Sequence, residues 1–244
     1  MSAPTTGPVT KPGRILWGLP DALLCWLAGY LGAILASFPL YAREGGTDID
    51  STLVFGVILP AQQLTVVLAV VYVSRLKGQK SLAADFGFRI RLLDAKALLI
   101  GATLEVLLSL ALLPILQLDP DAQHQQLLSD LREHRDAVTV ALFFLGAVVF
   151  APIVEELLFR GILLRALLRK FPPATAVLGS SVVFALVHYV GDPNTLPFLP
   201  ALAALGAILA ITALKTGNLS TAIWIHAGFN LTTTIWFLST STPS

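Results

Sequence analysis

Glu155, Glu156 and Arg160 place three charges directly after an apolar run of 18 residues, 137–154. A charged side chain at bilayer depth costs about 2.5–3.5 kcal/mol, so such groups persist where they pair, face water or take part in chemistry. Residues four apart share a helical face, which predicts that Glu156 pairs with Arg160. Glu155 points about 100° away from Glu156 and can face a cavity. The pattern therefore predicts a reactive Glu155 beside a structural Glu156.

His188 is placed opposite Glu155 by a turn. Pro172 and Pro173 interrupt the helical pattern midway between the two residues. A hairpin that bends there brings Glu155 and His188 level with each other on antiparallel helices. A carboxylate next to an imidazole can deprotonate a water molecule as a general base.

His226 and Asn230 lie four residues apart in a later apolar stretch, so they share one helical face. An imidazole and an amide on one face can donate hydrogen bonds to a developing oxyanion. Together with Glu155 and His188, these residue types predict hydrolysis of an amide bond by an activated water, without a protein nucleophile.

The composition is that of an integral membrane protein. Of the 244 residues, 55% are hydrophobic and 13% are charged. Soluble domains have about 25% charged residues. Stretches that are long enough to cross a bilayer predict an all-α, polytopic membrane helix bundle of about seven transmembrane helices, with short interfacial helices. The expected transmembrane helices are 22–42, 53–74, 95–117, 137–154, 175–191, 197–214 and 219–238.

The basic residues predict the orientation of the bundle. With a cytoplasmic N-terminus, thirteen Lys and Arg residues fall on the cytoplasmic side, whereas Arg43, Arg132 and Arg135 fall on the other. Cytoplasmic loops carry an excess of such residues, so we expect the N-terminus in the cytoplasm and the C-terminus outside it.

Four parts are expected along the chain. They are a cytoplasmic tail at 1–21, N-terminal transmembrane helices and connections at 22–136, a catalytic helical core at 137–238 and a short C-terminal tail at 239–244. Within the second part, the basic segment 75–96 carries Phe86, Phe88, Leu92 and Leu93, which is typical of an amphipathic connection on anionic headgroups. The polar segment 119–136 predicts a short interfacial helix on the far side, with solvated His124 and His134.

Three motifs in order along the chain resemble those of a known family. Glu155-Glu156-x-x-x-Arg160, Phe184-x-x-x-His188 and His226-x-x-x-Asn230 are similar to the motifs of the CAAX-processing and bacteriocin-processing (CPBP, ABI) intramembrane glutamic endopeptidases. The resemblance covers about residues 137–238. Each motif alone is weak, but three in order on separate membrane helices are specific.

The resemblance implies a protease with a chamber open to the cytosol and no metal cofactor. It implies that Glu155 and His188 activate the water and that His226 and Asn230 form the oxyanion site. The residues that would support the fold are Glu156, Arg160 and Phe184. The implied partners are the membrane and a peptide or protein substrate, with a lipidated C-terminus in eukaryotic relatives, and no nucleic acid. The short chain looks more like the prokaryotic branch, which implies a prokaryotic plasma membrane.

Other functions fit parts of the same pattern. Glu155, His188 and His226 are donors that Zn²⁺ accepts, which leaves a zinc-dependent intramembrane protease as an alternative, although the string His-Glu-x-x-His is absent. Ser180 or Ser181 with a histidine weakly suggests a serine protease. A non-catalytic membrane scaffold or immunity protein would keep only the helical bundle.

Glu105 is a further acidic residue within an expected transmembrane helix. An unpaired carboxylate there would be expensive, so we expect it to be protonated, paired or lining the chamber. Proton-coupled transport through Glu105 is a further alternative, but the chain shows no repeated pair of interrupted helices.

Overall fold

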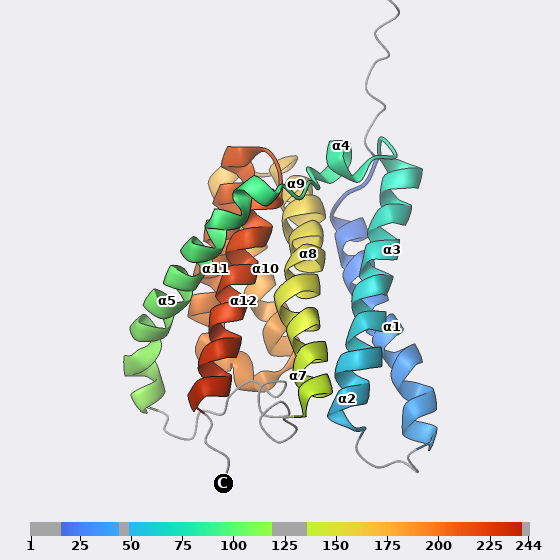
Figure 1. The fold of residues 1–244 in the computed structure, drawn as a ribbon. Coiled ribbons are helices and arrows are strands. Elements are labelled where there is room, and N and C mark those ends of the chain that lie inside the picture. Colours follow the sequence, from blue (N-terminus) through green and yellow to red (C-terminus); the bar gives the residue numbers. More distant parts are fainter. Residues whose placement is uncertain (1–15, 44–48, 119–135, 241–244) are drawn as a thin grey trace, which may run out of the picture.

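The computed structural model describes residues 16–43, 49–118 and 136–240. Over these residues the chain is helical and contains no strand, so the expected all-α fold is confirmed (Figure 1). The α-helices are α1 (Leu19–Arg43), α2 (Ser51–Leu53), α3 (Leu59–Lys77), α4 (Leu82–Phe86), α5 (Leu98–Leu118), α7 (Ala137–Phe144), α8 (Ala151–Glu156), α9 (Leu164–Leu168), α10 (Pro173–Gly191), α11 (Leu199–Thr216) and α12 (Ser220–Thr240). Three π-helical segments (Val54–Ile58, Leu145–Phe150, Leu157–Leu163) and two 3₁₀ segments (Leu92–Ala97, Pro193–Phe198) continue neighbouring helices.

Six helices in the described part are long and apolar enough to cross a membrane, as expected for a multi-pass membrane protein. They are Leu19–Arg43, Ser51–Lys77, Leu92–Pro114, Ala137–Leu168, Pro173–Gly191 and Pro193–Thr216. The seventh expected span corresponds to α12, which has 21 residues but is not one of these six. Polar residues, including His226 and Asn230, lower the mean hydropathy of α12. The helix can carry these two side chains because they face the interior of the bundle.

One unbroken helical run of 32 residues, Ala137–Leu168, carries Glu155 and Glu156 in its interior. The expected span ended at Val154, but the helix continues through Leu157–Leu163 and α9. It then turns, and α10 begins at Pro173. The expected hairpin is therefore present. Pro173 can begin α10 because proline suits the first turn of a helix.

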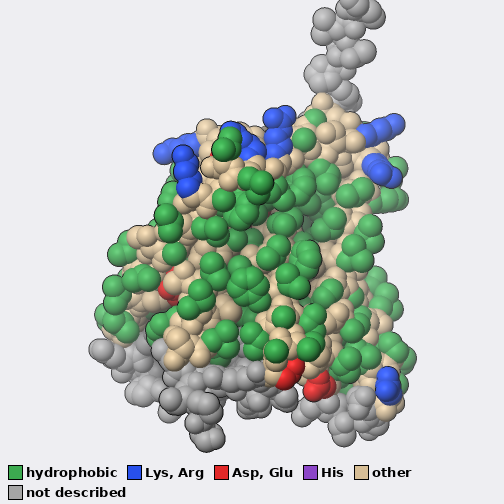
Figure 2. Space-filling view, viewed as in Figure 1, with side chains coloured by type: hydrophobic (Ala, Val, Ile, Leu, Met, Phe, Trp, Pro, Cys, Tyr) green, Lys and Arg blue, Asp and Glu red, His purple; other side chains and the backbone are tan. Residues whose placement is uncertain are grey.

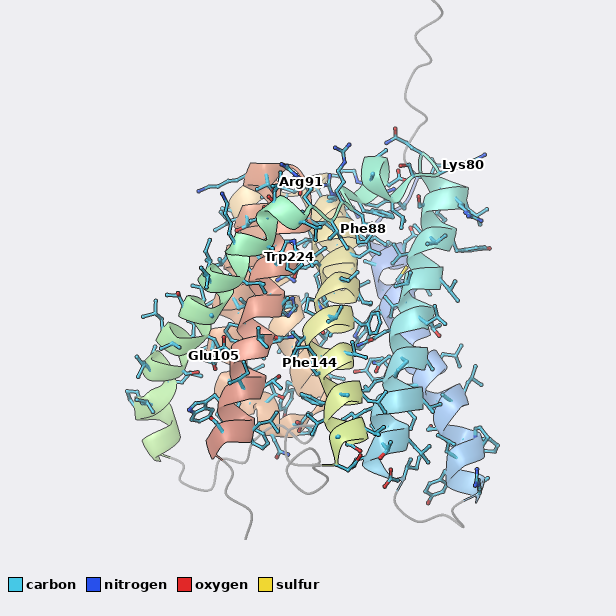
Figure 3. All side chains as sticks on the ribbon, in the orientation of Figure 1. Lys80, Phe88, Arg91, Glu105, Phe144 and Trp224 are labelled. Atoms are coloured by element: carbon cyan, nitrogen blue, oxygen red, sulfur yellow. The ribbon has the colours of Figure 1, made fainter. Side chains whose placement is uncertain are left out.

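The long helices pack in pairs around this central run. In Figure 1, α1 and α3 lie on one side of it, α5 and α12 lie on the other, and α10 and α11 lie behind. Lys and Arg side chains gather at one end of the bundle (Figure 2), where Lys80 and Arg91 lie (Figure 3). Arg43 is the last residue of α1, and this helix ends at the opposite end of the bundle (Figure 1). This asymmetry agrees with the expected N-terminus in the cytoplasm, which remains a prediction.

The connection between α3 and α5 is anchored in the bundle more firmly than we expected. Phe86 is fully buried, and Asp85 accepts hydrogen bonds from Ser74 Oγ at 2.6 Å and from the Gln79 amide. Gly161 makes room for Phe86, because a Cβ there would lie 3.1 Å from the Phe86 Cβ. The expectation that this segment rests on headgroups was therefore wrong for Phe86. The large apolar side chains that it exposes are Ile90, Leu92 and Leu93.

Two other expectations lie largely or wholly outside the described residues. These are the interfacial helix with His124 and His134, and the first 15 residues of the tail.

Glycines set the separation of α5 and α12. A Cβ on Gly101 would meet the Ile225 carbonyl oxygen and would lie 2.7 Å from the Phe229 amide nitrogen. A Cβ on Gly228 would meet the carbonyl oxygen of Leu98. These contacts are to backbone, which cannot rotate away. Small residues at both crossing points therefore let the two backbones approach closely, as is common in membrane helix pairs.

Replacing Gly228 with Ala is expected to push α5 away from α12 and to destabilise the protein by about 1–3 kcal/mol, as for other overpacked sites. Thermal unfolding of the purified protein in detergent measures this as a lower midpoint. The control is Gly146→Ala, because a Cβ on Gly146 meets nothing within 4 Å. Equal midpoints for the two variants would contradict the prediction.

Candidate active site

Glu155 lies between two imidazoles that come from different helices. Its Oε2 is 3.8 Å from His188 Nε2 of α10 and 3.7 Å from His226 Nε2 of α12. Both distances exceed a hydrogen bond, and Oε2 has no hydrogen-bond partner among the described residues. The hairpin thus brings Glu155 and His188 level, as the sequence predicts. Two imidazole nitrogens therefore flank one carboxylate oxygen.

The orientation of His188 follows from its other ring nitrogen. Nδ1 lies 2.7 Å from the carbonyl oxygen of Phe184, one turn earlier on α10. A carbonyl oxygen only accepts, so Nδ1 carries the hydrogen of the neutral ring. His188 therefore presents an unprotonated Nε2 to Glu155 in its neutral form.

Glu156 forms the predicted pair with Arg160, and it does more. Arg160 Nη1 donates to Glu156 Oε1 at 2.7 Å, and both side chains are fully buried. The same Oε1 lies 3.1 Å from Nδ1 of His226, a contact that the spacing along the chain did not predict. Glu156 thus links the buried arginine to the imidazole that faces Glu155.

Arg160 is fixed by groups from two further helices. Its Nη2 donates to the carbonyl oxygen of Gly206 on α11 at 3.1 Å, and its guanidinium lies 4.4 Å from the centre of the Phe184 ring. The Phe184 ring also packs edge-to-face with the rings of His188 and His226, with centroids 4.7 and 5.8 Å apart. Phe184 therefore spaces both imidazoles and covers the arginine, which explains an aromatic residue at this position.

A comparison with protein families agrees with this arrangement. A family model described as Type II CAAX prenyl endopeptidase Rce1-like matches residues 137–232. These residues form an Rce1-like domain. The expected family is confirmed for this segment, and the family is one of proteases. The curated proteins and the solved structures contain no match to the chain.

Asn230 of the Rce1-like domain closes a gap in the backbone bonding of the central helix. In the π-helical segment Leu145–Phe150, the Ala151 amide donates to the carbonyl five residues back, that of Gly146. The next carbonyl, of Ala147, would be served in this pattern by Pro152, which has no N–H. Asn230 Nδ2 donates to it at 2.8 Å. Pro152 was a signal in the sequence that could have indicated this contact.

A cavity of about 290 Å³ connects these groups in the interior of the bundle. Glu155, His188, His226 and Asn230 all line it, and so does Glu105 of α5, which lies outside the matched segment. Most of the remaining wall is apolar, for example Leu108, Leu112, Leu202, Leu205 and Phe229. The expectation that Glu105 lines the chamber is therefore consistent with the structure.

The residues of the serine alternative lie elsewhere. Ser180 Oγ donates to the Phe159 carbonyl at 3.4 Å, Ser181 Oγ donates to the Val177 carbonyl at 2.7 Å, and neither residue lines the cavity. For the zinc alternative, the described residues contain no group of three or more His, Cys, Asp and Glu side chains arranged to hold a metal ion.

Proposed function

We propose that this protein is an intramembrane endopeptidase that hydrolyses a peptide bond near the cytoplasmic leaflet. The observation that supports it best is the position of Glu155, which lines a cavity inside the bundle and whose Oε2 lies within 4 Å of two imidazole nitrogens. A carboxylate in this setting is suited to take a proton from water. The Rce1-like match supports a peptide as the substrate.

In the proposed reaction, Glu155 is the general base. It removes a proton from a water molecule whose oxygen attacks the peptide carbonyl, and it returns this proton to the leaving amine. The unprotonated Nε2 of His188 accepts the second hydrogen of the water and so orients it. His188 can accept this hydrogen because its Nδ1 donates to the Phe184 carbonyl, which leaves Nε2 as the acceptor.

His226 and Asn230 are proposed to stabilise the oxyanion. Nε2 of His226 lies 3.7 Å from Glu155 Oε2, and Nδ1 lies 3.1 Å from Glu156 Oε1, which fixes the orientation of the ring toward the reacting groups. Asn230 has a second amide hydrogen beside the one that it donates to Ala147. Glu156 is therefore a positioning residue for His226 and also supports the fold.

The site lies nearer to the basic end of the bundle. His226 is six residues, about 9 Å, along α12 from its start at Ser220, and this start lies at the end where Arg91 lies. With the N-terminus in the cytoplasm, the reacting groups lie in the cytoplasmic leaflet.

Asn230→Ala is expected to lower kcat by about 10²- to 10³-fold, the usual cost of losing one oxyanion donor. KM should change little, since the interaction strengthens in the transition state. Steady-state cleavage of an internally quenched peptide by the reconstituted protein measures both constants. Thr232→Ala is the matched control on the same helix, because Thr232 does not line the cavity. Equal losses in the two variants would argue against an oxyanion role.

The proposal is tested by comparing the protein N-termini in membranes of cells that carry the wild type or Glu155→Gln. New N-termini that appear only with the wild type identify both the cleavage reaction and its substrates. Identical N-termini, with both proteins present at equal levels, would favour the non-catalytic scaffold. A chelator added to the purified wild type distinguishes the proposed protease from the zinc-dependent one. The zinc alternative requires that the metal-free protein lose its activity.

A further inference from the structure

Glu105 is a second carboxylate in the wall of the proposed catalytic cavity. It lies on α5 beside α12 (Figure 3), and only 7% of its surface is exposed. Ser109 Oγ donates to its Oε1 at 2.9 Å. Thr233 Oγ1 of α12 lies 3.4 Å from the same oxygen and 3.2 Å from the Phe229 carbonyl oxygen, and its hydroxyl can donate to either. The second oxygen, Oε2, makes no hydrogen bond or ion pair among the described residues and can receive a ligand.

The described wall of the cavity carries no lysine or arginine side chain to balance this carboxylate. Glu105 and Glu155 both line it, whereas no lysine or arginine occurs among its described lining residues. Arg160 pairs with Glu156 behind the wall and is fully buried. A buried carboxylate is costly unless a charge or hydrogen bonds compensate it. A cationic group from a ligand would supply the compensation that the walls do not.

The helical register places Glu105 at a defined distance from the reacting groups. Thr233, whose Oγ1 lies 3.4 Å from Glu105 Oε1, follows His226 by seven residues on α12, which is about 10.5 Å along the helix axis. Asn230 lies between them and faces the same cavity. An extended peptide rises about 3.3 Å per residue, so this distance equals about three residues.

We propose that Glu105 is a specificity residue that binds a lysine or arginine side chain of the substrate, about three residues from the scissile bond. The inference rests on the proposed protease function and adds the charge of the substrate to it. The apolar walls, including Leu108, Leu112 and Phe229, suit the hydrocarbon stem of such a side chain, whose charged end reaches Oε2. A glutamate at the same substrate position would be repelled.

Binding to an inactive protein tests the subsite without relying on cleavage. Glu155→Gln protein in neutral-lipid nanodiscs is titrated with fluorescent apolar peptides that carry lysine, norleucine or glutamate at one position, scanned along the peptide. Neutral lipid removes the attraction of the membrane surface for cations. We expect one position at which lysine binds about tenfold more tightly than norleucine, near the low end of coupling between close charges. Glutamate should bind more weakly than norleucine there.

Adding Glu105→Gln to this protein should reduce the lysine preference to less than twofold. The matched control is Asp94→Asn, which removes one acidic charge from the Leu92–Ala97 segment outside the cavity and should leave the preference intact. A preference that survives Glu105→Gln, or that is absent at every position, overturns the subsite. Cleavage by the wild type locates the scissile bond in each peptide. If the preferred lysine does not lie two to four residues from that bond, the proposed distance between the subsite and the scissile bond is wrong.

Failure of the subsite is distinguishable from failure of the protease. Peptide cleavage that requires Glu155 but shows no Glu105-dependent charge preference retains the protease and removes the subsite. A Glu105-dependent binding preference in a wild-type protein that cleaves none of the bound peptides retains a cation-binding cavity and argues against the protease.

Discussion

Glu155→Gln is expected to lower the single-turnover rate of peptide cleavage by about 10³- to 10⁴-fold, at the upper end of what general-base catalysis contributes. Glutamine has the size and shape of glutamate, but it cannot take a proton from water. The two facing imidazole nitrogens, 3.7 and 3.8 Å away, would remain in place. The rate is measured with excess reconstituted protein and an internally quenched peptide, so that slow product release does not mask the chemical step.

A folding defect would mimic this loss, so the unfolding midpoint of Glu155→Gln has to be measured as well. We expect it to remain near that of the wild type, since Oε2 makes no hydrogen bond among the described residues. Asp94→Asn, the same acid-to-amide change outside the cavity, should keep the wild-type rate. A Glu155→Gln variant that folds and cleaves within tenfold of the wild type would exclude Glu155 as the base.

Arg160→Met should destabilise the protein by about 3–5 kcal/mol, the usual cost of breaking a buried ion pair. Methionine keeps much of the volume, but Glu156 would then be a fully buried carboxylate without its guanidinium. The Gly206 carbonyl would also lose the donor that reaches it from Arg160. Denaturant titration in detergent micelles, followed by circular dichroism, reports the loss of stability.

The reason for that loss is tested by a second substitution. Glu156→Gln in the Arg160→Met background should recover part of the stability, because the unpaired charge is removed. Activity should not return, since Glu156 also holds Nδ1 of His226 at 3.1 Å. A double variant no more stable than Arg160→Met would show that lost packing, for example against Phe184, is the main effect.

The local contacts of the site were predictable from the sequence because helical periodicity relates residues four apart. Glu156 and Arg160 pair on one face, and the prolines at 172 and 173 turn the chain so that Glu155 and His188 meet. The apolar stretches likewise predicted the all-helical membrane fold. Each of these predictions depends on the spacing of residues within one helix or one hairpin.

The sequence by itself determined which side chains could react and on which helical faces they lie. Only the tertiary structure decided that Glu156 contacts His226, that Asn230 serves the Ala147 carbonyl, and that Glu105 enters the cavity. These contacts join helices far apart in the chain. They depend on how each helix is rotated about its axis and how closely backbones approach at Gly101 and Gly228. Periodicity specifies a face, but not the neighbour that the face meets, because that neighbour is chosen by packing of the whole bundle.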